Sequence, residues 1–264
     1  MTGDEERFVR VEYTGRVGVV TLDRPERLNA MGDTMDVQFW EALREVYERP
    51  EVRAVLWRAE GRAFSAGRDL NELGVRPEGT TDYQYISDGH AKTHDLLVPP
   101  PIPVVVAIQG WCIGGSFERA LLCDIRIASK DAKFRLPELS HGLVPDSGGT
   151  ARIFQMCGHG VASDLVLSGR MMDAEEALRH GIVSRVVERE ELDEQAMDLA
   201  TQIAEQPPLA VKLHRQLLAN LGSEEVARSL REELLAQMLV YQSADFAELK
   251  SSRAEGRDPE FRGT

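Results

Sequence analysis

Residues 103–122 read PVVVAIQGWCIGGSFERALL, and this stretch decides the fold class. Residues 103–108 are rich in β-branched side chains, which is typical of a strand buried on both faces of a sheet. A glycine-rich turn follows, and residues 117–122 have the pattern of a helix. Residues 124–128 then predict the next strand. Strand, helix and strand at this spacing predict right-handed crossovers and a largely parallel sheet.

The segments before this stretch fit the same α/β class. Residues 8–13 and 17–22 are rich in β-branched residues and flank a Thr-Gly-Arg turn, which predicts a hairpin. Residues 33–47 carry apolar side chains at helical spacing, with Asp33 as the expected N-cap. Residues 52–57 predict a further strand.

Later in the chain the balance shifts to helix. Amphipathic patterns predict three long helices, over residues 192–206, 209–220 and 224–241. A late strand is expected at residues 183–187, and the polar residues 77–88 are interpreted as a loop over a site. We therefore expect an α/β core over residues 1–200 and a helical C-terminal region over residues 201–264.

The composition argues against several classes of partner. The 264-residue chain has 42% apolar and 28% charged residues, the profile of an ordinary globular protein. Its net charge of −13 disfavours nucleic acid and anionic membranes, because both bind clustered Lys and Arg. Its three cysteines show neither disulfide nor metal spacing, so we expect no metal site and a reducing cytoplasmic location. The first ten residues are acidic and lack the apolar segment of a secretory signal.

Two glycine-containing turns follow predicted strands. One spans residues 63–70 (AFSAGRDL) and the other spans residues 110–118 (GWCIGGSFE). Glycine lets the backbone approach a ligand, and the N–H groups at a helix N-terminus favour negative charge. Gly114-Gly115 lacks the spacing of a dinucleotide- or phosphate-binding loop, so nucleotide binding is not indicated. Taken alone, each turn is explained at least as well by ordinary turn chemistry.

Three acidic residues stand just after these turns. Glu118 falls in the first turn of the predicted helix, Glu138 follows Pro137, and Asp146 precedes a Ser-Gly-Gly turn. Each has an ordinary alternative role: a helix-dipole partner for Glu118, a solvated loop acid for Glu138 and a helix N-cap for Asp146. Only their combination with the turns favours catalysis.

In combination these motifs resemble the crotonase family, the enoyl-CoA hydratase/isomerase superfamily, over nearly the whole chain. The matching segments stand in the family's order: DRPERLNA (residues 23–30), AFSAGRDL (63–70), GWCIGGSFE (110–118), PE (137–138), GLVP (142–145) and GGT (148–150). The resemblance implies a core of repeated ββα units and a helical C-terminal region that forms trimers, assembled as a dimer of trimers. It also implies an acyl-CoA thioester substrate; coenzyme A is part of that substrate, and no separate cofactor is expected.

By residue match, the resemblance assigns roles to individual positions. The amides of Ala66 and Gly115 are expected to donate to the thioester oxygen, and such a donor is typically worth about 10²–10³ in rate. Glu118 is expected to hold and activate a water molecule, and Glu138 to supply a proton to C2 of a 2-enoyl-CoA. The protein is thus predicted to be an enoyl-CoA hydratase.

Substrate binding is expected around the first turn. Arg27 and Arg68 are the best placed cations for the CoA phosphates, with a solvated surface role as the alternative for each. The backbone near Asp69 and Leu70 is expected to cover the adenine. The complete expected binding set is Arg27, Ala66, Gly67, Arg68, Asp69, Leu70 and Gly115.

Asp146 leaves another function open. Some members with a third acid in this region move a double bond or dehalogenate, and the spacing of Glu138 and Asp146 resembles that of dienoyl-CoA isomerases. Those enzymes carry aspartate where this chain has Glu118. An enoyl-CoA or dienoyl-CoA isomerase using Glu138 and Asp146 is therefore the main alternative. A non-catalytic CoA- or RNA-binding relative and an acyl-CoA hydrolase are further alternatives, and only the hydrolase would release free CoA thiol.

Two positions depart from the family pattern. Ser116 replaces a glycine that is common in the second turn. Arg119 puts a cation beside Glu118, which would hold Glu118 ionised if the side chain points into the site and would change nothing if it points outward.

Overall fold

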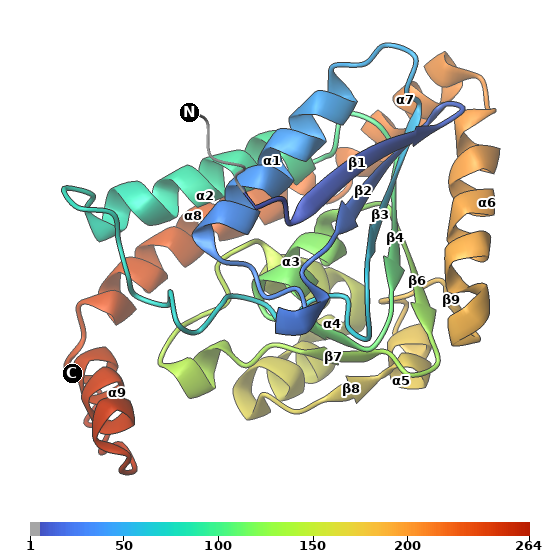
Figure 1. Cartoon of the computed structure of the whole chain (residues 1–264). Coiled ribbons are helices and arrows are strands. Elements are labelled where there is room, and N and C mark those ends of the chain that lie inside the picture. The colour runs from blue at the N-terminus through green and yellow to red at the C-terminus, as the bar shows by residue number, and fades with distance from the viewer. Residues whose placement is uncertain (1–5) are drawn as a thin grey trace.

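A six-stranded sheet in the order β1-β2-β3-β4-β6-β9 forms the centre of this computed structural model, which describes residues 6–264 (Figure 1). The strands are β1 (Val9–Thr14), β2 (Val17–Leu22), β3 (Ala54–Ala59), β4 (Val104–Ile108), β6 (Ile125–Ser129) and β9 (Arg185–Val187). β1 and β2 pair antiparallel, and the other neighbours in this sheet pair parallel. The predicted hairpin and the largely parallel sheet are both confirmed.

Helices cover both faces of this sheet, so its central strand β4 is buried along its whole length. On one face, α6 (Leu192–Ala204) packs a row of Leu and Ala side chains against β2, β3 and β4. On the other face lie α1 (Asp33–Tyr47) and α3 (Gly115–Leu122), whose apolar residues join the larger core. Phe39 of α1 and Trp57 of β3 stack there with ring centroids 4.7 Å apart.

Two successive ββα units carry the second glycine turn and the acids that follow it. β4 leads into β5 (Trp111–Ile113) and α3, and β6 leads into β7 (Lys133–Arg135) and α4 (Gly149–Ser168). β5, β7 and β8 (Met172–Asp173) form a second, three-stranded sheet, whose β7 and β8 run along the lower edge of Figure 1. Because α3 packs against α4, the N-terminus of α4 lies beside Glu118.

Two local predictions are wrong. Residues 77–88 are not all loop, because α2 (Asp82–Leu97) begins at Asp82 after a capping box. Thr81 accepts the Gln84 N–H with its side chain, and the Gln84 side chain accepts the Thr81 N–H in return. Asp33 is not an N-cap either: Gly32 holds that position, and the Asp33 carboxylate instead pairs with Arg68 at 2.6 Å.

The C-terminal region is helical, as predicted. It comprises α7 (Pro208–Ala219), α8 (Ser223–Tyr241) and α9 (Ala244–Glu255). α8 packs against α2 and α4, whereas α9 projects away from the sheet in Figure 1. The boundary expected at residue 200 falls inside α6, which packs on the sheet and ends at Ala204. Val226 and Leu230 of α8 also belong to the main core. The short helices elsewhere are α5 (Ala174–Arg179), η1 (Pro25–Arg27), η2 (Glu138–His141) and η3 (Arg189–Glu191).

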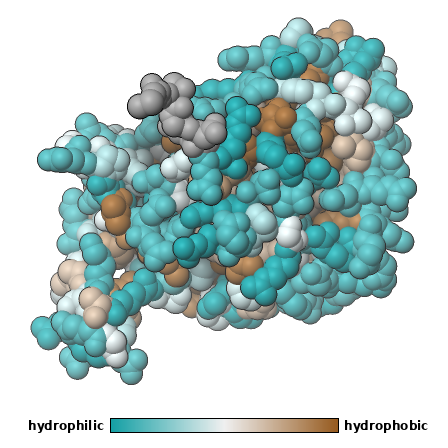
Figure 2. Space-filling model, in the orientation of Figure 1, coloured by the Kyte–Doolittle hydropathy of each residue, from teal (hydrophilic) through white to brown (hydrophobic). Residues whose placement is uncertain are grey.

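The surface agrees with the charged composition. Figure 2 shows a face that is mostly hydrophilic, with apolar residues in small groups. Across residues 6–264, no helix combines the length and the apolar character that crossing a bilayer requires. The prediction that the first ten residues carry no secretory signal falls partly on residues 1–5, which lie outside the described residues.

Candidate active site

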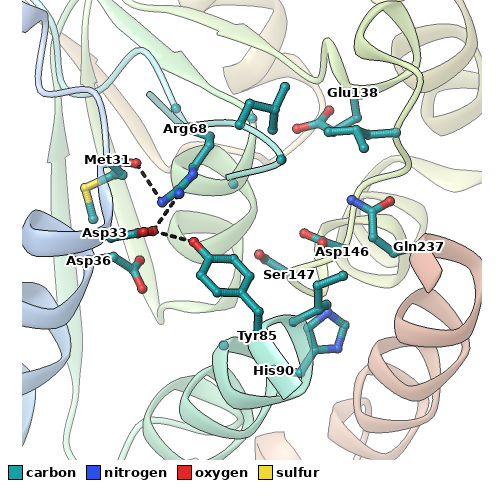
Figure 3. A pocket seen from close by; sticks show the side chains of 18 of the residues that line it. Met31, Asp33, Asp36, Arg68, Tyr85, His90, Glu138, Asp146, Ser147 and Gln237 are labelled. Atoms are coloured by element: carbon teal, nitrogen blue, oxygen red, sulfur yellow. Dashed lines mark hydrogen bonds and ion pairs between the residues drawn. The ribbon is translucent and has the colours of Figure 1, made fainter. Parts of the chain in front are cut away.

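One cavity of about 640 Å³ collects most of the predicted site residues. It is enclosed by the two glycine turns, the acids, α2 and the C-terminal end of α8 (Figure 3). Of the predicted residues, those that line it are Ala66, Gly67, Arg68, Leu70, Gly115, Glu118, Glu138 and Asp146. Arg27 and Asp69 lie outside this lining. Arg27 is exposed at the end of η1, while Asp69 is buried and paired with Arg24 at 3.1 Å.

The two glycine turns lie side by side. Ser65 pairs with the strand β5 through two backbone hydrogen bonds, to Trp111 O at 2.8 Å and from the Ile113 N–H at 3.0 Å. Gly67 follows at a φ of +84°, and a Cβ there would come within 2.7 Å of the Ile113 carbonyl oxygen. Only glycine fits at this contact without strain, which explains its place between the turns.

Two of the free N–H groups at these turns belong to Arg68 and Gly115. The Ala66 N–H, the predicted donor of the first turn, instead donates to Leu28 O at 2.9 Å, and the Gly67 N–H donates to Ser65 Oγ at 3.1 Å. Within residues 6–264, neither the Arg68 amide nor the Gly115 amide has a hydrogen-bond partner. The geometry therefore argues against Ala66 and favours Arg68 as the partner of Gly115.

Ser116, the departure from the family's glycine, joins the two turns. Its buried hydroxyl lies 2.8 Å from Ser65 Oγ. The Ser65 hydroxyl donates its one proton to Asn29 O at 2.7 Å, so the Ser116 hydroxyl must be the donor between the two serines. A side-chain hydrogen bond thus connects the turns next to their free amides.

Glu118 is held by the backbone that leads into α4. Its side chain is only 1% exposed. Oε2 accepts the N–H groups of Ser147 and Gly149, both at 3.0 Å, and Oε1 accepts the Asp146 N–H at 3.3 Å. Burial, followed by the charges of Glu138, Glu233 and Asp146, raises the pKa of Glu118 well above its usual value.

Glu138 and Asp146 face the same side of the cavity (Figure 3). Burial raises the pKa of Glu138 to about 8, and the nearby Asp146 adds to the shift. Burial also raises the pKa of Asp146 to about 6, although Arg119 opposes that rise. The Glu138 Oε2 atom is buried and, among the residues described, has no hydrogen-bond partner. With this raised pKa and an oxygen that no N–H group of the described residues contacts, Glu138 can keep a proton near neutral pH.

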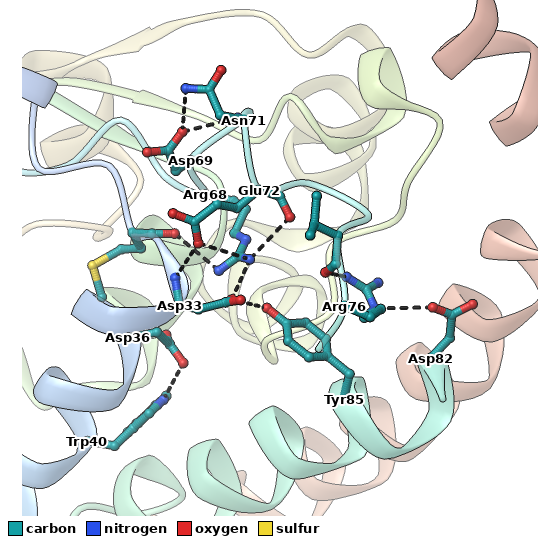
Figure 4. A network of polar contacts seen from close by, with 12 residues as sticks. Asp33, Asp36, Trp40, Arg68, Asp69, Asn71, Glu72, Arg76, Asp82 and Tyr85 are labelled. Carbon is teal, nitrogen blue, oxygen red and sulfur yellow. Dashed lines mark hydrogen bonds and ion pairs between the residues drawn. The ribbon is translucent and has the colours of Figure 1, made fainter. Parts of the chain in front are cut away.

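Arg68 and Arg119, two of the arginines that line the cavity, are already paired. Arg68 donates to Asp33 at 2.6 Å and to Glu72 O at 3.3 Å, and Asp33 also accepts the Tyr85 hydroxyl (Figure 4). Arg119 lines the cavity but points toward α1, where it pairs with Asp36 at 2.6 Å and lies 4.6 Å from the Trp40 ring. Its charge therefore acts on Asp36 and Asp146.

Two polar residues of α8 were missed at the sequence level. The buried face of this helix is Val226, Leu230, Glu233 and Gln237, a helical i, i+4, i+7, i+11 row. The Glu233 carboxylate accepts the Gly148 N–H at 2.9 Å, and Gln237 accepts the Val144 N–H at 3.0 Å. Their place in the same helical row as Val226 and Leu230 is the sequence signal that could have identified Glu233 and Gln237 as buried polar residues.

Paired N–H donors beside carboxyl groups in one cavity define a class of enzymes that stabilise an oxyanion while they move protons. A family model described as enoyl-CoA hydratase/isomerase matches residues 12–264. The chain belongs to this enzyme family.

Individual relatives agree with this assignment over nearly their whole length. A probable enoyl-CoA hydratase of Mycobacterium bovis is 34% identical, over 96% of this chain and 97% of the relative. A carnitinyl-CoA dehydratase of Salmonella arizonae is 36% identical, over 97% and 98%. A crystal structure of an enoyl-CoA hydratase/isomerase from Pseudoalteromonas atlantica superposes with a TM-score of 0.84 at 32% identity, covering 97% of this chain and 100% of that one. The fold is therefore the crotonase fold.

Proposed function

We propose that the protein is an enoyl-CoA hydratase that adds water across the 2,3 double bond of a 2-enoyl-CoA. The observation that carries the proposal is the placement of Glu118 and Glu138 in one cavity with the free amides of Arg68 and Gly115. The hydratase names of several relatives support it.

The acids divide the proton transfers between them. Four carboxyl groups near α4 influence one another's protonation: Glu118, Glu138, Asp146 and Glu233. Three backbone N–H groups around Glu118 stabilise negative charge there, whereas Glu138 keeps its proton. Glu118 accepts a proton from water as the water oxygen bonds to C3. The double-bond electrons move toward the thioester oxygen, where the Arg68 and Gly115 amides stabilise the enolate. Glu138 then gives its proton to C2, and proton exchange with solvent resets both acids.

The CoA moiety is proposed to bind along the first turn. Ala66, Gly67, Asp69 and Leu70 supply backbone contacts there, as the resemblance implies. Of the two predicted phosphate partners, Arg27 is the better one, because its side chain is exposed while Arg68 is engaged by Asp33.

A second candidate function is a double-bond isomerase that uses Glu138 and Asp146. The observation in its favour is that the Asp146 carboxyl lines the cavity on the same side as Glu138, while Glu118 is occupied by backbone N–H groups. Two acids on one side of a bound acyl chain suit proton removal at one carbon and return at another.

Loss of the conjugated-thioester absorbance of crotonyl-CoA separates the two functions. We expect hydration by the wild-type protein, and in Asp146→Asn a decrease of kcat smaller than about tenfold, since Asp146 makes neither proton transfer in this scheme. Absence of hydration with short and long 2-enoyl-CoA, together with Asp146-dependent turnover of 3-enoyl- or dienoyl-CoA, would move the assignment to isomerase. Release of free CoA thiol would instead indicate a hydrolase.

We also propose a homotrimer, or a dimer of trimers, acting in the cytoplasm. α7 has no buried residue in the single chain, and its leucines at i, i+4 and i+8, Leu209, Leu213 and Leu217, are 67%, 50% and 62% exposed. Such an apolar row needs a partner surface. Light scattering is expected to give a mass of three or six chains, and a stable monomer would contradict the proposal.

A further inference from the structure

Glu233 is a buried carboxylate that takes no part in the proposed reaction. It hydrogen-bonds to residues 146–149, the same segment whose N–H groups bind Glu118. Glu233 lies on α8 and is only 7% exposed. Its side chain extends to the N-terminus of α4. Its Oε2 accepts the Gly148 N–H at 2.9 Å, and its Oε1 accepts the Ser229 hydroxyl at 2.8 Å. Both carboxylate oxygens are thus used within the protein.

Glu118 and Glu233 share one short stretch of backbone. The N–H groups of Asp146, Ser147 and Gly149 point at Glu118, while the Gly148 N–H between them points at Glu233. The two carboxylates therefore accept hydrogen bonds from residues 146–149 on two sides, Glu118 from α3 and Glu233 from α8. The room is tight, because a Cβ on Gly149 would lie 2.5 Å from the Glu118 Cγ.

We infer that Glu233 is a positioning residue that fixes residues 146–149, so that their N–H groups orient Glu118 and their turn aims Asp146 into the cavity. The expected effects on kcat rest on the proposed function, whereas the contact between Glu233 and the Gly148 N–H does not. It assigns to a C-terminal helix a part in building the acid site.

The charge of Glu233 adds a second effect. The negative charge of Glu233 raises the pKa of Glu118, although burial and the charge of Glu138 are larger causes of that shift. The ionisable groups that face this pair come from several elements: Glu138 from η2, Asp146 from the segment before α4 and His90 from α2. Arg119 of α3 acts on Asp146 and pairs with Asp36. Removing one negative charge from the group makes ionisation of Glu118 easier.

Two substitutions separate position from charge. Glu233→Gln keeps an oxygen for the Gly148 N–H and an amide for Ser229 Oγ, so geometry is retained while the charge is lost. We expect the acidic limb of its kcat–pH profile to move to lower pH. Glu233→Leu loses both hydrogen bonds, and we expect kcat to fall about tenfold or more with a smaller change in KM. Glu232→Gln and Glu232→Leu are matched controls, because the neighbouring Glu232 side chain is 72% exposed.

Hydrogen exchange provides a readout that does not depend on activity. In the full-length protein, we expect faster amide exchange in the peptide spanning residues 146–149 for Glu233→Leu, and wild-type exchange for Glu233→Gln and both controls. Wild-type exchange and wild-type kcat in Glu233→Leu would overturn the inference, and an unshifted profile in Glu233→Gln would overturn its charge component. If the wild type hydrates no enoyl-CoA, the proposed function fails, while the exchange experiment still decides on Glu233.

Discussion

Glu138→Gln is expected to lower kcat for crotonyl-CoA hydration by about 10²–10⁴-fold, because it removes the proton donor for C2 while it keeps the size of the side chain. The physical basis is that burial raises the pKa of Glu138 to about 8, so that a carboxyl group stays protonated near neutral pH. Glutamine cannot supply that proton.

The same residue predicts the pH dependence. An acid with a raised pKa carries its proton below that pKa and loses it above, so wild-type kcat/KM should fall as the pH rises through about 8. This limb should be absent from Glu138→Gln. Glu190→Gln is the control, because Glu190 is an exposed glutamate in another short 3₁₀ helix. Retention of wild-type kcat in Glu138→Gln would remove Glu138 from the mechanism.

Glu118→Gln is expected to cost about 10² or more in kcat, since it removes the base that activates water. Its geometry explains a second effect. Three backbone N–H groups point at the two carboxylate oxygens, so one end of a glutamine amide would place its NH₂ group against an N–H donor. An unpaired buried N–H typically costs about 1–3 kcal/mol, and the free energy of unfolding should fall accordingly.

Glu118→Asp refines this test. Aspartate keeps the charge but is one methylene shorter, so it does not reach all three N–H groups from the same backbone position. We expect kcat to fall with little change in KM, as for a group that acts in the transition state. Glu41→Gln on the exposed side of α1 is the control for both kinetics and denaturant unfolding. Unchanged kcat in both Glu118 variants, with hydration intact, would show that another group activates the water.

The paired networks around the cavity explain why sequence position alone misjudged some roles. Arg68 looked like a free cation for phosphate, yet Asp33 engages its guanidinium, and the useful part of Arg68 is its backbone amide. The Ala66 amide looked like a donor, yet Leu28 O already accepts it. Which amide is free depends on a loop some forty residues earlier in the chain, and no local pattern reports that.

Local periodicity was enough for much of the fold. The strand over residues 17–22 and the helix over residues 33–47 have the same bounds in the structure as in the prediction. Their patterns depend on nearest neighbours: β-branched runs for strands and a 3.6-residue apolar spacing for helices. The helix α2 was missed because its start is polar, and a capping box rather than an apolar row begins it.

The sequence by itself determined the α/β class, the two glycine turns, and Glu118, Glu138 and Asp146 as the acids of the candidate site. These features follow from short-range patterns and from motifs in a recognisable order. Only the tertiary structure decided that Arg68 rather than Ala66 has the free amide, that Arg119 faces Asp36, and that Glu233 supports the acid site. The reason is physical: a hydrogen bond or a burial cost depends on which distant segments the fold brings into contact, and that information is absent from any single stretch of chain.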